Sequence, residues 1–478
     1  MDRRSFVAGS IALASAAATP SLFSSDRAFA QSAAAPPSKR PEPGKRKFVS
    51  TAVDERIAQV KKKIRNPQLA WLFENCYPNT LDTTVDFSTS DGQPDTFVIT
   101  GDIDAMWLRD STAQTTPYLS LVHLDPHLRE MYRGLMRRQA RCILIDPYAN
   151  AFYSSARYGE WKDDETTMKP GVHERKWEID SLCYPIRLAY LYWQQTHDPV
   201  PFTAEWSQAA HRIVETFRVE QRITADSPYR FARKATSFTD NAPNDGRGNP
   251  TRKIGLIHSA FRPSDDSCLF PFLVPSNMFA RTSLDQLAVI AREVLHDASL
   301  ESSAKSLSAQ LAKALEEYAI TEHPKHGRIF AYEIDGYGNR LWMDDANAPG
   351  LVSLAYLGCL DRKDSLYQNT RNFALSEDNP YYMRGKYAEG VGGPHTGPGT
   401  IWPLSIIMRA LTSTDSAEIK NCIEMLMRTD AGTGFMHESL DPNNPGKFTR
   451  SWFAWCNSLF GEMIATMADQ HPDLLSSI

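Results

Sequence analysis

Apolar residues recur at helical spacing along most of the chain. One example is the series Leu284, Leu287, Ala288, Ala291, Val294 and Leu295. Because residues at i, i+3, i+4 and i+7 share one face of a helix, this pattern predicts an amphipathic helix. The same spacing predicts helices over 307–318 and 179–193, with Pro185 either kinking the latter or marking its start.

Weaker helical patterns occupy much of the remaining chain, and strand-like alternation is rare. The best strand candidate is 328–334, followed by a turn at 336–339. The chain is therefore predicted to be mostly α, with few short strands in loops. The weaker helical stretches lie near 55–75, 117–142, 204–220, 350–376, 401–411, 416–429 and 452–467.

The loops between these stretches share an unusual composition, dense in acidic residues, Trp, Arg, Gly and Asn. Helical hairpins arranged in a ring would bring such loops to one face, where loops on a rigid scaffold commonly perform function. We predict a single domain over 51–478, an (α/α) toroid with a site assembled from many loops. The loops are 101–111, 173–181, 261–267, 333–347, 387–403 and 437–457.

The composition is that of a folded protein. Among 478 residues, 42% are hydrophobic and 23% charged, and 52 Lys+Arg against 57 Asp+Glu give a formal charge of −5. These values exclude a disordered chain, a collagen-like repeat and a basic nucleic-acid binder. The length fits several domains of ordinary size or one large barrel.

The first 30 residues have the features of an export signal. Arg3 and Arg4 precede an apolar run from Phe6 to about Ala18, and small residues at 28–30 suit cleavage. We predict a Tat-type signal peptide over 1–30, with a Sec signal as the alternative, and a flexible leader over 31–50. The mature protein is then periplasmic or secreted. No later stretch is long and apolar enough for a membrane helix.

The seven cysteines are at positions 76, 142, 183, 268, 359, 422 and 456. None forms C-x-x-C, and most lie among apolar residues. Buried free thiols are therefore expected, although one disulfide is an open alternative.

The loop 101–111 concentrates charge around a tryptophan. Asp102, Asp104, Arg109 and Asp110 surround Trp107. Carboxylates and guanidinium groups can bind vicinal hydroxyls, and an indole ring can stack on a pyranose. We interpret these residues as candidate sugar ligands. The alternative is a capped helix start with a structural ion pair.

Two adjacent carboxylates follow a proline in the segment 261–266. If both Asp265 and Asp266 are buried, one is expected to be protonated or to pair with Arg262. A raised pKa is what a general acid requires, so either residue is a candidate acid. The alternative is a helix N-cap made by Ser264 or Asp265.

A third candidate carboxylate is Glu438, between His437 and Ser439. The segment 448–455 follows closely and contains Arg450 and two tryptophans. Glu438 is a candidate general base for a water molecule. The alternative is a surface glutamate that hydrogen-bonds its neighbours.

The segment 389–402 is rich in glycine and contains His395. Glycines let the backbone approach a ligand closely. The segment lacks the P-loop spacing and no strand precedes it, so a ligand-lining loop is favoured over a phosphate loop. A plain connector is the alternative.

Metal ligands are weakly indicated. His123 and His127 are spaced for one helix face, but Pro126 lies between them. The segment 344–347 holds Asp344, Asp345 and Asn347 without the spacing of a calcium loop. No dinucleotide fingerprint occurs. We therefore expect neither a metal nor an organic cofactor.

Several of these motifs together resemble glycoside hydrolase family 125, the exo-α-1,6-mannosidases. The resemblance spans about residues 50–470 in colinear order. It implies an (α/α)6 barrel that removes non-reducing terminal α-1,6-linked mannose with inversion and without a metal. The resembling segments are GDIDAMWLRDSTAQTTPYL (101–119), EIDSLCYP (178–185), FRPSDD (261–266), MDDAN (343–347), EGVGGPHTG (389–397), HES (437–439) and FTRSWFAW (448–455).

By this resemblance the general acid is Asp265 or Asp266, with a preference for Asp265, and the general base is Glu438. Ser451 stands where a charged residue is expected in relatives, so one contact of that loop is open. The expected substrate ligands are Asp102, Asp104, Trp107, Arg109, Asp110, Arg262, Asn347, His395 and Arg450.

Two other functions fit the same residues. One is a glucoamylase-like inverting glycosidase on the same barrel; the other is a non-catalytic periplasmic glycan-binding protein. The expected partner is an α-mannoside glycan, with neither nucleic acid nor a membrane after signal cleavage. We expect a monomer.

Overall fold

The computed structural model describes residues 36–90, 92–234 and 237–478. The predicted signal peptide 1–30 and the first part of the predicted leader, 31–35, lie outside the described residues. Residues 36–478 group as one compact unit. All helices and strands below belong to this unit.

The segment 36–50, expected to be a flexible leader, packs against the domain. The indole of Trp71 donates to the Pro37 carbonyl at 2.9 Å, and Phe48 is buried. Arg40 pairs with Asp54 and Asp82, each at 2.8 Å. The basic composition of this segment suggested solvent exposure, but carboxylates distant in sequence bind it, so the packed domain begins before residue 51.

Short polar side chains cap many helices at their N-termini, which explains where these helices begin. Ser50, Asn66, Asp125, Thr203 and Asp297 each accept hydrogen bonds from backbone amides of the first turn. The helices of the described chain are α1 Thr51–Lys61, α2 Pro67–Cys76, α3 Asn79–Thr83, α4 Leu108–Thr115, α5 Pro126–Ile145, α6 Ile179–Thr196, α7 Ala204–Glu220, α8 Pro243–Gly246, α9 Val274–Ile290, α10 Ala298–Tyr318, α11 Ser365–Ala374, α12 Pro403–Leu411, α13 Ser416–Arg428, α14 Ala454–Gln470 and α15 Pro472–Ser476.

Most predicted helices are found, with shifted ends. The pattern at 284–295 begins in α9 and continues into a π-helix, η5 (Ala291–Leu295). The pattern at 307–318 belongs to α10, and Pro185 lies inside α6. The helix predicted over 350–376 is wrong in its first half. Only a short 3-10 helix, η6 (Val352–Leu354), and turns precede α11 there. Apolar residues in this half are buried by their neighbours without continuing a helix.

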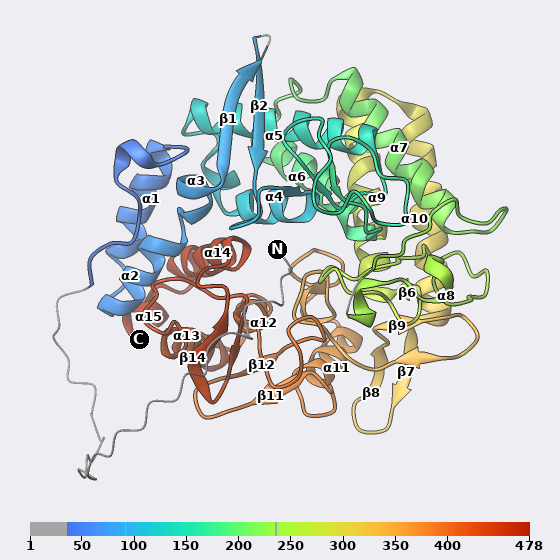
Figure 1. The fold of residues 1–478 in the computed structure, drawn as a ribbon. Coiled ribbons are helices and arrows are strands. Elements are labelled where there is room, and N and C mark those ends of the chain that lie inside the picture. The colour runs from blue at the N-terminus through green and yellow to red at the C-terminus, as the bar shows by residue number, and fades with distance from the viewer. Residues whose placement is uncertain (1–35, 91, 235–236) are drawn as a thin grey trace, which may run out of the picture. The chain divides into compact units, whose positions relative to one another are not determined.

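One series of helices packs in succession (Figure 1). Helix α4 contacts α6, and α6 contacts α9; η6 contacts both α9 and α12; α12 contacts α14, and α14 contacts α4. Further helices lie against members of this series, because α5 contacts α6, α10 contacts α9 and α13 contacts α12. The loops that enter these helices therefore come from distant parts of the sequence.

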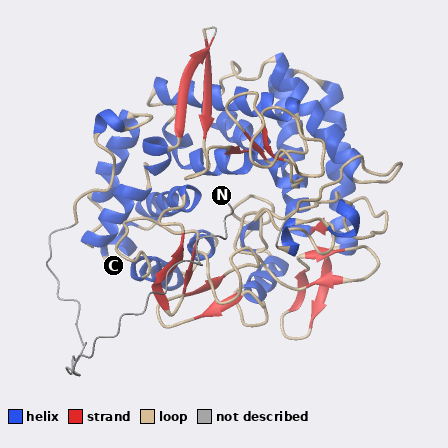
Figure 2. Cartoon of the chain, viewed as in Figure 1, coloured by secondary structure: helices blue, strands red, loops and turns tan. Residues whose placement is uncertain are grey.

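The strands are short, and Figure 2 shows them scattered among the helices. The strand predicted over 328–334 is split into β8 and β9, with β10 after the predicted turn. The sheets, all antiparallel, are β1 (Val85–Ser90) with β2 (Gln93–Val98), β3 (Met106–Trp107) with β4 (Ala151–Phe152) and β5 (Val172–Glu174), β6 (Phe272–Leu273) with β9 (Glu333–Ile334) and β10 (Arg340–Leu341), β7 (Ile320–His323) with β8 (Gly327–Phe330), β11 (Tyr382–Arg384) with β12 (Glu389–Val391), and β13 (Ser439–Asp441) with β14 (Asn444–Thr449).

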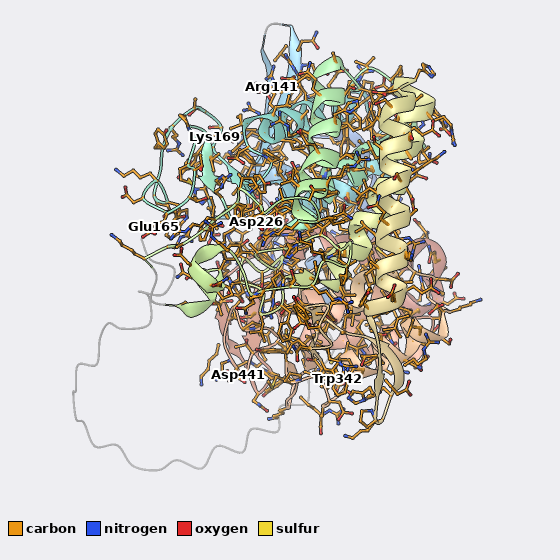
Figure 3. All side chains as sticks on the ribbon, turned by 90° about the vertical axis from the view of Figure 1, so that its right-hand side faces the viewer. Arg141, Glu165, Lys169, Asp226, Trp342 and Asp441 are labelled. Atoms are coloured by element: carbon orange, nitrogen blue, oxygen red, sulfur yellow. The ribbon has the colours of Figure 1, made fainter. Side chains whose placement is uncertain are left out.

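Apolar side chains form one large core, while charged side chains such as Glu165 and Lys169 lie at its periphery (Figure 3). All seven cysteines are free thiols, and each except the half-buried Cys359 is buried. Within the described residues, no helix combines the length and apolar character needed to cross a bilayer.

Gly461 provides a test of the packing between α14 and the end of α2. A Cβ at this position would lie 2.7 Å from the Cα of Tyr77, a backbone atom that cannot easily move. We expect Gly461→Ala to lower the free energy of unfolding by about 1–3 kcal/mol, measured as a reduced Tm by calorimetry. Gly44→Ala is the control, since nothing lies within 4 Å of its added Cβ. Equal Tm values for the two variants would contradict this packing.

Candidate active site

The two adjacent carboxylates occupy a tight turn and not a helix start. The Arg262 amide donates to the Asp266 carbonyl at 2.7 Å, and the Asp265 amide donates to the Arg262 carbonyl at 2.9 Å. Asp265 has a φ of 66°, in the left-handed region that few residues other than Gly, Asn and Asp adopt. The next α-helix begins only at Val274, so the helix-capping alternative does not apply.

A buried lysine holds this turn from the segment that follows β5. The Lys176 ammonium donates to the Asp265 carbonyl at 2.7 Å and lies 3.2 Å from an Asp240 oxygen and 3.8 Å from a Glu174 oxygen. Burial acts to lower the pKa of Lys176, but Glu174 and Asp265 outweigh it and raise the pKa. Lys176 is therefore a permanent cation beneath the strained residue.

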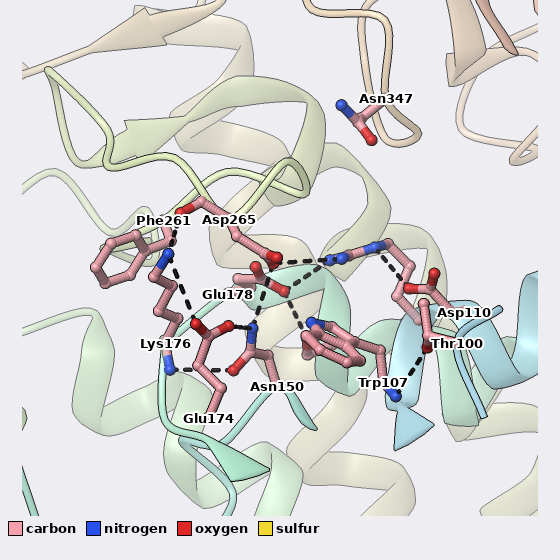
Figure 4. A network of polar contacts seen from close by, with 12 residues as sticks. Thr100, Trp107, Asp110, Asn150, Glu174, Lys176, Glu178, Phe261, Asp265 and Asn347 are labelled. Atoms are coloured by element: carbon pink, nitrogen blue, oxygen red, sulfur yellow. Dashed lines mark hydrogen bonds and ion pairs between the residues drawn. The ribbon is translucent and has the colours of Figure 1, made fainter. Parts of the chain in front are cut away.

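The guanidinium of Arg109, in the first turn of α4, is surrounded by four carboxyl groups. Three of these acidic residues, Asp110, Glu178 and Asp265, are labelled in Figure 4. Its nitrogens lie 2.7 Å from a Glu178 oxygen and 3.2 Å from an Asp180 oxygen. They also lie 3.3 Å from an Asp110 oxygen and 3.5 Å from Asp265 Oδ1. One cation thus joins the starts of α4 and α6 to the turn that contains Asp265.

This cluster has more carboxyl groups than Arg109 can neutralise. Burial raises the pKa of Asp110 to about 6 and that of Asp180 to about 6, although Arg109 opposes both shifts. Burial likewise raises the pKa of Glu178 well above its usual value, and the neighbouring Asp265 adds to the effect. The cluster therefore keeps protons at a pH where exposed carboxylates have lost them.

Asp266 points to a different partner, His395. Its Oδ1 lies 3.4 Å from the His395 Nδ1, and its buried Oδ2 has no hydrogen-bond partner among the described residues. Burial acts to lower the pKa of His395, but Asp266, then Glu438 and Asp265, raise it above its usual value. One imidazole therefore lies within electrostatic reach of all three candidate catalytic carboxylates.

Glu438 lies directly before β13, and Arg450 lies directly after β14. The Arg450 Nε is 3.2 Å from Glu438 Oε1, and its Nη1 pairs with Asp102. The hairpin thus presents Glu438 beside a cation and ties it to the loop 101–111. Ser451, the residue expected to be charged in relatives, is exposed.

The other predicted ligands differ in accessibility. Asp104 is 79% exposed in its side chain and pairs with Arg157 at 2.8 Å. Trp107 is only 2% exposed and packs with Ala105 and Ala151 in a small core, so its ring lies within the protein. A sugar-stacking role for Trp107 would require this loop to rearrange.

Arg262 and Asn347 are bound by buried partners. Arg262 donates to Glu333 at 2.6 Å, and Asn347 donates through Nδ2 to Asp345 at 2.8 Å. Figure 4 shows Asn347 apart from the residues around Arg109. These two residues therefore support the loops next to the site and do not belong to the Arg109 cluster.

Sequence reasoning missed four residues that hold the site together: Asn150, Lys176, Glu178 and Asp180. Asn150 donates to Asp265 Oδ1 at 3.3 Å and to Glu174 at 2.9 Å. The charged residues of the loop 173–181 mark it as a candidate in the sequence, but their spacing does not indicate which of them lies beside Asp265. The density of ionisable residues between apolar neighbours was the available signal.

Comparison with known proteins assigns the chain to a family. The family model described as metal-independent alpha-mannosidase (GH125) matches residues 66–465. The chain therefore belongs to glycoside hydrolase family 125, a family of metal-independent alpha-mannosidases, and is a glycoside hydrolase.

Two relatives illustrate how much of the chain is shared. The meiotically up-regulated gene 157 protein of Schizosaccharomyces pombe is 41% identical over 458 residues, covering 92% of this chain and 90% of that protein. A metal-independent alpha mannosidase of Streptococcus pneumoniae, solved in a non-productive complex with alpha-1,6-mannobiose, is 40% identical. It aligns with a TM-score of 0.85 over 89% of this chain and 100% of that chain.

The raised pKa of His395 predicts a pH-dependent contribution to stability. Because the folded-state pKa exceeds the ordinary value of 6.5, protonated His395 stabilises the fold below pH 6.5. This contribution is lost as the pH rises through the folded-state pKa. We expect His395→Gln to be destabilising relative to wild type mainly below pH 6.5, measured as unfolding free energies across a pH series.

The exposed His471, at the end of α14, provides the matched control as His471→Gln. A difference between wild type and His395→Gln that grows with rising pH would contradict the placement of His395 among the three carboxylates.

Proposed function

We propose that the protein is an inverting, exo-acting glycoside hydrolase that releases non-reducing terminal α-1,6-linked mannose. The main support is the meeting of Asp265, Asp266 and Glu438 around His395, from loops far apart in sequence. The alpha-1,6-mannobiose in the Streptococcus pneumoniae relative supports the linkage. The exo mode rests on the resemblance of the loop motifs.

Asp265 is the proposed general acid. Its side chain is 11% exposed, whereas that of Asp266 is 2% exposed and turned to His395, so Asp265 can more readily reach a glycosidic oxygen. The proton moves from the Asp265 carboxyl to that oxygen as the bond to the anomeric carbon breaks. The electron pair of the broken bond stays on the departing oxygen.

Glu438 is the proposed general base. It removes a proton from a water molecule on the opposite face of the sugar, and the hydroxide oxygen bonds to the anomeric carbon. Arg450, which also binds Asp102, orients Glu438 at 3.2 Å. Inversion requires room for the water, so the two carboxyl groups are expected roughly 6.5–9.5 Å apart in the substrate complex.

The scaffold for this chemistry is proposed to be an (α/α)6 barrel. The succession α4, α6, α9, η6, α12 and α14, in which α14 contacts α4 again, supports a ring of inner elements. Each loop of the site precedes a member of such a ring: Arg109 is in α4, Asp180 in α6, and His395 lies before α12. The ring would thus present the loops on one face.

Export through the Tat route is also proposed. Arg3, Arg4 and the apolar run after them support it, although they lie outside the described residues. Seven free thiols fit a chain that folds before it leaves the reducing cytoplasm. The mature enzyme would then be periplasmic or secreted.

Substitution of the two proposed catalytic carboxylates tests the assignment. We expect Asp265→Asn and Glu438→Gln each to reduce kcat on α-1,6-mannobiose by ~10²–10⁴ while Tm changes little. Asn is chosen at position 265 because it tolerates the left-handed backbone. Asp86→Asn, an exposed carboxylate paired with Lys47, is the control and should retain activity. Full activity of Glu438→Gln would refute its role as the base.

The configuration of the first product tests inversion. We expect ¹H NMR of the reaction to show β-mannose before mutarotation supplies the α anomer. Initial α-mannose would indicate retention. Glucose release from α-glucosides would indicate a glucoamylase-like enzyme, and tight binding without turnover would indicate a glycan-binding protein.

A further inference from the structure

Glu178 is fully buried and lies directly beside Asp265. Its Oε2 accepts hydrogen bonds from Arg109 at 2.7 Å and from the Ser181 hydroxyl at 2.9 Å. Its Oε1 receives no hydrogen bond from an amide, hydroxyl or cationic group of the described residues. This leaves Oε1 for the carboxyl group of Asp265, which lies next to it in Figure 4.

The two carboxyl groups lie side by side in Figure 4. A hydrogen bond between them requires a proton on one of them, because two carboxylates offer only acceptors. Arg109 contacts both, with Nη1 on Glu178 and Nη2 3.5 Å from Asp265 Oδ1. Arg109 is thus one cation in direct contact with both carboxyl groups, which favours one negative charge and one proton between them.

We propose that Glu178 is a positioning residue that shares one proton with Asp265 and so keeps Asp265 able to act as the acid at neutral pH. This inference rests on the proposed function, in which Asp265 protonates the glycosidic oxygen. After that step both carboxyl groups are ionised and held by Arg109, Ser181 and Asn150. Water then restores the proton through Asp265, because Glu178 has no exposed surface.

The neighbouring charges fit a pair with one proton. The cations that face it are Arg109 from α4, Lys176 from the segment after β5, and His395. The acids are Asp110, Asp180, Asp266 and, through Asn150, Glu174, which also pairs with a further cation, Arg233, at 2.8 Å. The thiol of Cys268 is also near. Since acids outnumber cations, ionising both members of the pair is unfavourable. The raised pKa of Glu178, due first to burial, agrees with this.

Glu178→Gln tests the proposal through the pH dependence of catalysis. The amide has no ionisable proton and can donate to an Asp265 carboxylate, so Asp265 should ionise at lower pH. We expect the alkaline limb of kcat/KM on α-1,6-mannobiose to move down by about one pH unit or more, with about tenfold or greater loss at neutral pH. Activity on 2,4-dinitrophenyl α-mannoside, whose leaving group needs no proton, should be largely kept.

Glu220→Gln is the matched control, because Glu220 is equally buried and binds Arg222 and the Tyr148 hydroxyl away from the site. It should leave the alkaline limb in place even if Tm falls. If Glu178→Gln does not fold, Glu178→Asp, which withdraws the carboxyl by one methylene, should move the limb in the same direction. An unmoved limb in the folded variant overturns the proposal.

Asp265→Asn in the same assays separates this inference from the proposed function. If Asp265→Asn hydrolyses α-1,6-mannobiose normally, the acid is misassigned and both proposals fail. If Asp265→Asn loses this activity but keeps the dinitrophenyl substrate, while Glu178→Gln leaves the limb unmoved, only the role of Glu178 fails.

Discussion

The site depends on one buried guanidinium. Arg109 contacts all four carboxyl groups of the cluster, those of Asp110, Glu178, Asp180 and Asp265. Four carboxyl groups so close together would repel one another, and burial removes the water that could screen them. The fold can keep this arrangement only because Arg109 is fixed in α4 and because some carboxyl groups stay protonated. The excess of carboxyl groups over cations thus constrains the structure. It is also what keeps a proton available for the proposed acid catalysis.

Around this centre, each candidate catalytic group is held by a residue from another part of the chain. Lys176 binds the backbone of the turn at Asp265, His395 faces Asp266, and Arg450 links Glu438 to Asp102. These contacts join segments that only the packing of the helices brings together. The separation gives neighbouring carboxylates different environments, which is how similar groups acquire the distinct roles of acid and base.

Periodicity predicted the helices well where one apolar face meets a core, as in α7, whose bounds match the predicted 204–220. It failed at 350–364, where apolar residues are buried in turns. The loops of the site were also predicted, because charge and tryptophan together are unusual. The contacts between these loops were not predicted, since Lys176 and Arg109 reach Asp265 from distant parts of the sequence. Trp107 is a further example. The composition of its loop suggested a ring that stacks on a sugar, but the ring is buried by packing with Ala151.

The attachment of residues 36–50 to the domain has a practical consequence for shortened forms of the enzyme. Asp82 is buried, and its carboxylate is neutralised by Arg40. A chain trimmed to begin at residue 51, where the first α-helix starts, would leave that carboxylate without its main counter-charge and uncover the apolar surface now beneath Phe48. A shortened chain that begins before residue 40 keeps the ion pairs of Arg40 and is better tolerated. The N-terminal boundary of a stable domain is therefore set by these ion pairs and not by the start of the first helix.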